Sequence, residues 1–123
     1  MLPAWLGQGR QIRSELGVRA LLQIAGSLMR IYLAGPMSGH VDHNKPAFHR
    51  HAAALRAMGH EVFNPAESKY ADEPTYRQAM REDLLWILDH AEAIALIPGW
   101  EKSKGVAVEI ALARCLKLWE IRL

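Results

Sequence analysis

The sequence predicts an α/β fold, in which a mostly parallel sheet of four to five strands lies between two layers of helices. Two observations support this prediction. From residue 29 onward, short apolar runs alternate with helix-like segments in β-α-β-α-β-α-β order. Three of these runs end at breaks, Gly35-Pro36, Asn64-Pro65 and Pro98-Gly99. Because parallel strands need crossover helices, a flavodoxin- or Rossmann-like three-layer α/β/α architecture follows.

The first half of this order contains two strands and one helix. The segment IYLAGPMSG, residues 31–39, runs from an apolar stretch into a Gly-Pro break, and it predicts a buried strand at residues 30–34. A helix is predicted at residues 46–58, because Pro46 lies at its start and Gly59 just past its end. The segment His60–Phe63 is predicted as a short strand that Asn64-Pro65 ends.

The second half adds two helices and two strands. Asp72, Glu73 and Pro74 open a helix predicted at residues 74–90. The run AIALI predicts a buried strand at Ala93–Ile97, and it is followed by a helix at residues 104–116 and a last strand in LWEIRL, residues 118–123. The carboxyl ends of parallel strands share one edge of a sheet, so the three breaks should meet at one pocket.

Residues 1–28 are predicted to be an N-terminal amphipathic extension to an α/β domain at residues 29–123. Leu21, Ile24, Ala25 and Leu28 form an apolar helical stripe. Arg19 and Gln23 interrupt the apolar stretch, which argues against a signal peptide. We interpret the segment as a dispensable extension; the alternative is a helix that covers the sheet or a partner subunit.

Composition excludes several classes of function. The net charge of +2 comes from residues 1–28, where three arginines and one glutamate give 3 − 1 = +2, and residues 29–123 balance 12 basic against 12 acidic residues. No broad basic surface for nucleic acid is therefore expected. No apolar run approaches the ~18 residues of a membrane helix. A single cysteine, Cys115, excludes an internal disulfide framework and favours a cytoplasmic protein.

Glu109 lies in the middle of an apolar helix, GVAVEIALARCL, which we expect to be buried on more than one side. At 100° per residue, its neighbours on the helix face are apolar: Gly105, Leu112, Ala113 and Leu116. A buried carboxylate without a partner is costly, so its presence suggests a function. The alternative is a side chain that reaches solvent past Gly105 and Ala113.

Asp83 is the second candidate, in the segment REDLLWILDH. It shares a helix face with apolar residues and is predicted to point inward; those residues are Tyr76, Ala79, Met80, Trp86 and Ile87. The alternative is an ion-pair partner for Arg77 or Arg81. Two inward carboxylates suggest glycosidic chemistry, in which one attacks the anomeric carbon and the other handles a proton. The environment would then have to leave Glu109 ionised.

Three segments together resemble the nucleoside 2-deoxyribosyltransferase-like superfamily: RIYLAGPMSG, GHEVFNPAE and MREDLLWILDHAEAIALIPGWEKSKGVAVEIALA. The resemblance covers residues 30–118 and is closest to a small bacterial and phage branch, with similarity to the 2'-deoxynucleoside 5'-monophosphate N-glycosidases. It implies cleavage of the N-glycosidic bond of a 2'-deoxynucleoside or its 5'-monophosphate, by hydrolysis or base transfer. It implies that Glu109 is the nucleophile, that Asp83 assists the base, and that Tyr32 lies near the nucleophile.

The resemblance also suggests substrate-binding residues. Ser103, six residues before Glu109 (109 − 6 = 103), stands where the transferases carry aspartate and the monophosphate hydrolases carry serine. It could hold a phosphate, act as a helix N-cap, or do both. The remaining candidates are Gly35, Ser38 and Gly39 for the sugar or phosphate, Asn64 and Trp100 for the base, and Gly105 beside the nucleophile. Trp100 could instead close the edge of the core.

The loop after the first core strand departs from the hydrolase pattern, because Pro36 and Met37 bring no donor side chains. The same pocket could therefore serve a non-catalytic nucleotide-binding or sensing module. No cofactor is expected. The histidine-rich segment HVDHNKPAFHRH lacks the spacing of a metal site, and Cys115 is predicted to lie in the core. The resemblance implies a homo-oligomer, a dimer or higher.

Overall fold

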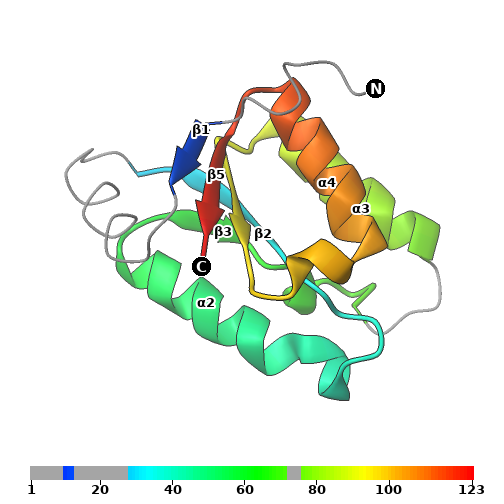
Figure 1. Cartoon of the computed structure of the whole chain (residues 1–123). Coiled ribbons are helices and arrows are strands. Elements are labelled where there is room, and N and C mark those ends of the chain that lie inside the picture. Colours follow the sequence, from blue (N-terminus) through cyan, green and yellow to red (C-terminus); the bar gives the residue numbers. More distant parts are fainter. Residues whose placement is uncertain (1–9, 13–27, 72–75) are drawn as a thin grey trace.

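The computed structural model describes residues 10–12, 28–71 and 76–123 (Figure 1). The strands are β1 (Arg10–Ile12), β2 (Arg30–Ala34), β3 (Glu61–Phe63), β4 (Ala93–Leu96) and β5 (Trp119–Arg122). The helices are α2 (Lys45–Ala57), α3 (Tyr76–Asp89) and α4 (Lys104–Cys115). Short 3-10 turns lie at η2 (Val41–Asn44), η3 (Pro65–Glu67) and η4 (Trp100–Lys102).

The five strands form one sheet in the order β1-β5-β4-β2-β3, and every neighbouring pair is parallel. Figure 1 shows α2 on one face of this sheet and α3 beside α4 on the other. The predicted three-layer parallel fold is therefore confirmed. The chain leaves β2 toward β3 on one side and returns to β4 on the other, so the strand order switches at β2, where ligands bind in such sheets.

Alternate residues of β2 supply the cores on the two faces of the sheet. Ile31 and Leu33 pack into a cluster with Phe48, Ala52 and Leu55 of α2. Tyr32 and Ala34 belong to a second cluster that includes Ile87 of α3 and Val106 and Ile110 of α4. This period of two is the property of a strand that is covered on both faces.

The strand β1 is absent from the sequence prediction. It pairs with β5 in parallel, with Arg10 opposite Trp119 and Ile12 opposite Ile121. The segment RQI contains a single apolar residue, so no apolar run marks it. The predicted amphipathic helix falls on residues that lie outside the described part, apart from Leu28, which is exposed.

The predicted burial of α4 holds only for the part of the helix that meets β4 and α3. Val108 and Leu116 are 48% and 41% exposed, and Cys115, predicted to lie in the core, is also exposed. The helix is an outer layer that contacts the sheet and α3, so its opposite face meets solvent. The exposed face cannot be recognised from the sequence because it contains alanines, and alanine is common on both sides of a helix. Among the described residues, no helix is long and apolar enough to cross a membrane.

Candidate active site

A pocket of about 710 Å³ opens at the carboxyl ends of the central strands. Residues from the end of β2 and the loop after it, Tyr32 to Ser38, form one wall. The start of α4, from Ser103 to Val106, and one face of α3 also line the pocket. The pocket therefore occupies the switch point of the sheet, as expected for this architecture.

Glu109 lies at the floor of this pocket and is 5% exposed. The hydroxyl of Tyr32, which is 1% exposed, donates a hydrogen bond of 2.6 Å to Oε2 of Glu109. Asp83 of α3 also lines the pocket, and its carboxyl interacts with both Tyr32 and Glu109. The structure thus brings together the three residues that the sequence suggested for catalysis.

Burial dominates the electrostatics of this carboxyl pair. It raises the pKa of Glu109 to about 8, a shift that the hydrogen bond from Tyr32 opposes and the nearby Asp83 increases. Burial likewise raises the pKa of Asp83 to about 7. The mechanism suggested by the sequence requires an ionised Glu109, whereas burial favours the protonated form of this carboxyl. Near neutral pH the two carboxyls share protons. Their apparent pKa values therefore describe the pair and not either residue alone.

Aromatic packing fixes the position of Tyr32. Its ring stacks on Phe63 of β3 with the centroids 5.5 Å apart, and Phe63 in turn contacts Trp86 of α3 at 5.2 Å. Burial, followed by the charge of Glu109, raises the pKa of Tyr32 well above its ordinary value. The phenol therefore stays protonated and acts as a fixed donor toward Glu109.

Two glycines keep the pocket walls close. A Cβ on Gly35 would lie 2.8 Å from Cβ of Ile97, so only glycine lets the loop after β2 pass the end of β4. A Cβ on Gly105 would lie 3.0 Å from the Tyr76 hydroxyl, and Gly105 thereby leaves room for that phenol beside the pocket. Both residues line the pocket, as the sequence suggested.

Ser38 and Ser103 both line the pocket. Oγ of Ser103 accepts a hydrogen bond of 3.3 Å from the backbone N–H of Val106, so the side chain is the N-cap of α4. The N-cap interpretation is therefore confirmed. The same residue lies at the pocket wall, where its hydroxyl hydrogen can face a ligand.

Three suggested residues lie away from the pocket wall: Gly39, Asn64 and Trp100. Gly39 has a φ of 82° and serves the turn after Ser38. Trp100 packs at the edge of the α3–α4 core, with the Arg122 guanidinium 5.6 Å from its ring. This position agrees with the alternative interpretation of Trp100 as a residue that closes the core.

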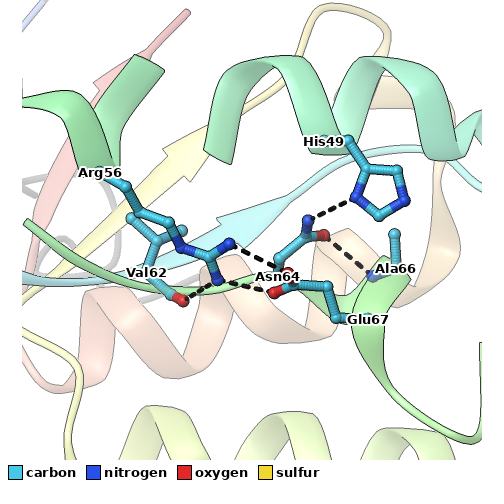
Figure 2. Close-up of polar contacts among 6 residues, drawn as sticks. All are labelled: His49, Arg56, Val62, Asn64, Ala66 and Glu67. Atoms are coloured by element: carbon cyan, nitrogen blue, oxygen red, sulfur yellow. Dashed lines mark hydrogen bonds and ion pairs between the residues drawn. The ribbon is translucent and has the colours of Figure 1, made fainter. Parts of the chain in front are cut away.

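Asn64 has a structural position (Figure 2). Its Oδ1 accepts a hydrogen bond from the backbone N–H of Ala66, and its amide lies 3.2 Å from Nδ1 of His49. In the same figure, Arg56 of α2 donates to both carboxylate oxygens of Glu67 and to the carbonyl of Val62. These bonds join α2 to the turn η3, which carries the pocket residue Pro65.

Several pocket residues were missed as site residues. Tyr76 and Met80 were predicted only as apolar neighbours of Asp83, although that shared helix face was the signal that could have found them. Lys102 and Lys104 flank Ser103 and give the mouth two cations. His40 and His43 also line the pocket, and nothing in their spacing indicates this. Within the described residues, no cluster of three or more His, Cys, Asp or Glu side chains could hold a metal ion.

The fold and the pocket define a small parallel α/β protein in which a buried glutamate lies beside a partly buried aspartate at the switch point of the sheet. Residues 29–120 match the family described as Domain of unknown function (DUF4406), and the chain belongs to this family. The matched range begins directly before β2 and contains all three residues of the pocket floor. No curated protein and no solved structure gives a significant match.

Proposed function

We propose that this protein cleaves the N-glycosidic bond of a 2'-deoxynucleoside or its 5'-monophosphate through a covalent deoxyribosyl-Glu109 intermediate. The observation that carries the proposal is the buried Glu109 carboxyl, bonded to Tyr32 and adjacent to Asp83 at the pocket floor. Retaining glycosidic cleavage needs one carboxylate to attack the anomeric carbon and one carboxyl to carry a proton. The resemblance to the nucleoside 2-deoxyribosyltransferase-like superfamily assigns these roles to the same residues.

In the first step, an oxygen of the Glu109 carboxylate bonds to C1' of the sugar as the C1'–N bond breaks. The base leaves with the electron pair and takes a proton from the Asp83 carboxyl. A pair that shares one proton supplies both forms, because Glu109 ionised with Asp83 protonated has the same charge as the reverse. The Tyr32 hydroxyl bond favours the form in which Glu109 is ionised.

In the second step, a nucleophile attacks C1' and releases Glu109 as a carboxylate. If the nucleophile is water, Asp83 takes its proton and the products are the free base and the sugar. If it is a second base, Asp83 takes the proton of the attacking nitrogen and the product is a new nucleoside. Addition of a labelled free base to the reaction separates these outcomes, because only a transferase incorporates the label.

The mouth of the pocket supports a 5'-monophosphate as the substrate. Lys102, Lys104 and His40 lie there with the hydroxyls of Ser38 and Ser103, opposite in character to the acidic floor. Cations and hydroxyl donors at a helix N-terminus favour a phosphate group. The serine at position 103, where the transferases carry aspartate, points in the same direction.

The direct test is to incubate the full chain with deoxynucleosides and their 5'-monophosphates and to measure free base by chromatography. We expect base release, fastest from a monophosphate. Lack of release from every substrate by a folded protein would contradict the proposal. Tight nucleotide binding without release would assign the pocket to a sensing module instead. The implied homo-oligomer stays a prediction that sedimentation velocity checks.

A further inference from the structure

The turn before α2 holds three consecutive residues in the left-handed backbone region. The φ angles are 51° for Asp42, 51° for His43 and 60° for Asn44, and none of them is glycine. Residues with a Cβ rarely adopt this conformation, and a run of three is costly. Such strain persists only where the surrounding structure holds it, and it gathers at functional sites.

A side-chain hydrogen bond holds this turn against the pocket. Asn44 precedes α2, but its side chain does not cap the helix. Its Nδ2 instead donates to the carbonyl oxygen of Pro36 at a distance of 2.9 Å. Pro36 is buried and Asn44 is half-buried, so water competes weakly for this bond. The bond closes the chain from residue 36 to residue 44 into a loop.

This loop is one wall of the candidate active site. Pro36, Met37, Ser38, His40 and His43 all line the pocket. Two backbone bonds continue the loop inside the closure, from the His40 N–H to the Met37 carbonyl at 3.2 Å and from the His43 N–H to the His40 carbonyl at 3.1 Å. The Asn44–Pro36 bond therefore closes the segment that carries the pocket residues Ser38 and His40.

We propose that Asn44 is a positioning residue, whose bond to the Pro36 carbonyl holds the 36–43 loop in the conformation that contacts the substrate. The inference rests on the proposed function for its kinetic effect, but the loop closure itself does not depend on it. The carboxyl pair belongs to α3 and α4 and not to this loop, so we expect the loop to contact parts of the substrate that do not react. Loosening it should weaken binding in the ground state and the transition state alike.

Two variants remove the bond while they tolerate the left-handed backbone. Asn44→Asp replaces the donor by an acceptor, and Asn44→Gly removes the side chain without adding a charge. Asp42→Asn is the matched control, since it changes a neighbouring left-handed residue and leaves the bond intact. The melting temperature of each variant is measured so that binding is compared only on folded protein.

The first readout is amide hydrogen exchange without ligand. We expect the His40 and His43 amides to exchange at least ~10-fold faster in both Asn44 variants, with β2 and β4 unchanged. Asp42→Asn should match the wild type. Unchanged exchange at His40 and His43 in the Asn44 variants would overturn the proposal, whether or not the protein releases base.

The second readout is affinity and turnover. We expect KM for a deoxynucleoside monophosphate to rise about 10-fold with kcat within about 3-fold, because the loop contributes uniform binding. In a Glu109→Gln background, Kd for the same nucleotide should rise equally, without turnover. A loosened loop with unchanged KM and Kd would overturn the positioning role. If the wild type releases no base and the Glu109→Gln protein binds no nucleotide, the proposed function fails, and exchange alone decides the loop closure.

Discussion

Two glutamates are buried on the α3–α4 side of the sheet, and their surroundings differ in kind. Glu120 of β5 is 1% exposed, and Arg114 of α4 donates to it from Nε at 2.6 Å and from a second nitrogen at 3.4 Å. Glu109 is 5% exposed, and its partners are a tyrosine hydroxyl and a second carboxyl. A cation neutralises the first glutamate, whereas no cation in the described part of the chain pairs with the second.

Glu120 and Glu109 show how a structural acid differs from a candidate catalytic one. A buried carboxylate that meets a guanidinium has its charge satisfied and is held in place. A buried carboxyl beside another acid has a raised pKa, because its charged form is unstable there. Protonation or formation of a covalent bond removes that charge and is therefore favoured. Burial alone therefore does not single out Glu109, but burial without a cation at the floor of a pocket does.

The largest expected difference is in activity. Glu109→Gln should lower the rate of base release at least ~10³-fold, because a covalent nucleophile is removed. Glu120→Gln should stay within about 3-fold of the wild type at a temperature where it is folded, since Glu120 does not line the pocket. An equal loss of base-release rate in the two variants would contradict the claim that only Glu109 is catalytic. Initial rates at saturating substrate measure both.

Stability should separate the two glutamates in the opposite direction. Glu120→Gln leaves Arg114 without its charged partner, and we expect a loss of about 2–4 kcal/mol in the free energy of unfolding. Arg114 is 25% exposed, so water relieves part of this cost and the lower end of the range applies. Urea denaturation at pH 7 measures it. A loss below about 0.5 kcal/mol, the range of an ordinary surface substitution, would show that the pair is not structural.

The stability of the Glu109→Gln variant relative to the wild type should depend on pH. Glu109 keeps its proton in the folded state up to about pH 8, whereas its ordinary pKa is 4.5, so folding takes up a proton between these values. The wild type should therefore lose stability as the pH rises through this window. Glu109→Gln has no proton to lose, and its advantage should grow to about 2–3 kcal/mol above pH 8, at ~1.4 kcal/mol per unit with a reduction for the shared proton.

Below pH 4.5 that advantage should vanish, because both proteins are then neutral at this position. Denaturation curves at pH 4, 6 and 9 measure the difference. A Glu109→Gln protein that is less stable than the wild type at pH 9 would mean that the protein stabilises the charged form of Glu109. That result would contradict the difference drawn between Glu109 and Glu120.

The smallest expected effect belongs to Tyr32→Phe. Loss of the hydroxyl removes the donor to Glu109, which raises the pKa of Glu109 further and leaves less carboxylate to attack. We expect base release to fall about 10–100-fold, with the rising limb of the pH–rate profile shifted to higher pH. A pH–rate profile checks both. An unchanged profile would show that Tyr32 is only a core residue of β2.

The sequence predicted the fold because its strands and helices leave strong local patterns. Ile31 to Ala34 and Ala93 to Leu96 are continuous apolar runs bounded by Gly and Pro breaks, as buried parallel strands require. Glu109 could be predicted as buried because a single charge in an apolar helix contradicts its surroundings. Glu120 could not, because WEIR alternates like a half-exposed strand, and its burial depends on Arg114 and on coverage by α4.

The composition of the pocket depends on tertiary geometry that the sequence does not show. Asn64 follows a strand as a ligand-binding residue would. Its side chain, however, accepts a hydrogen bond from the Ala66 N–H and contacts Nδ1 of His49. His40 lines the pocket just before three left-handed residues, and neither its place nor this turn is indicated by a residue pattern. The ionisation of the carboxyl pair also depends on depth of burial, which a helical wheel cannot give.

The most direct measurement of the central claim is the mass of the protein quenched in acid during turnover. We expect a deoxyribosyl or deoxyribosyl phosphate adduct on the peptide that contains Glu109, absent from Glu109→Gln and present in Glu120→Gln. Base release at full rate with every carboxyl unmodified, or an adduct on Asp83 with Glu109 free, would contradict it.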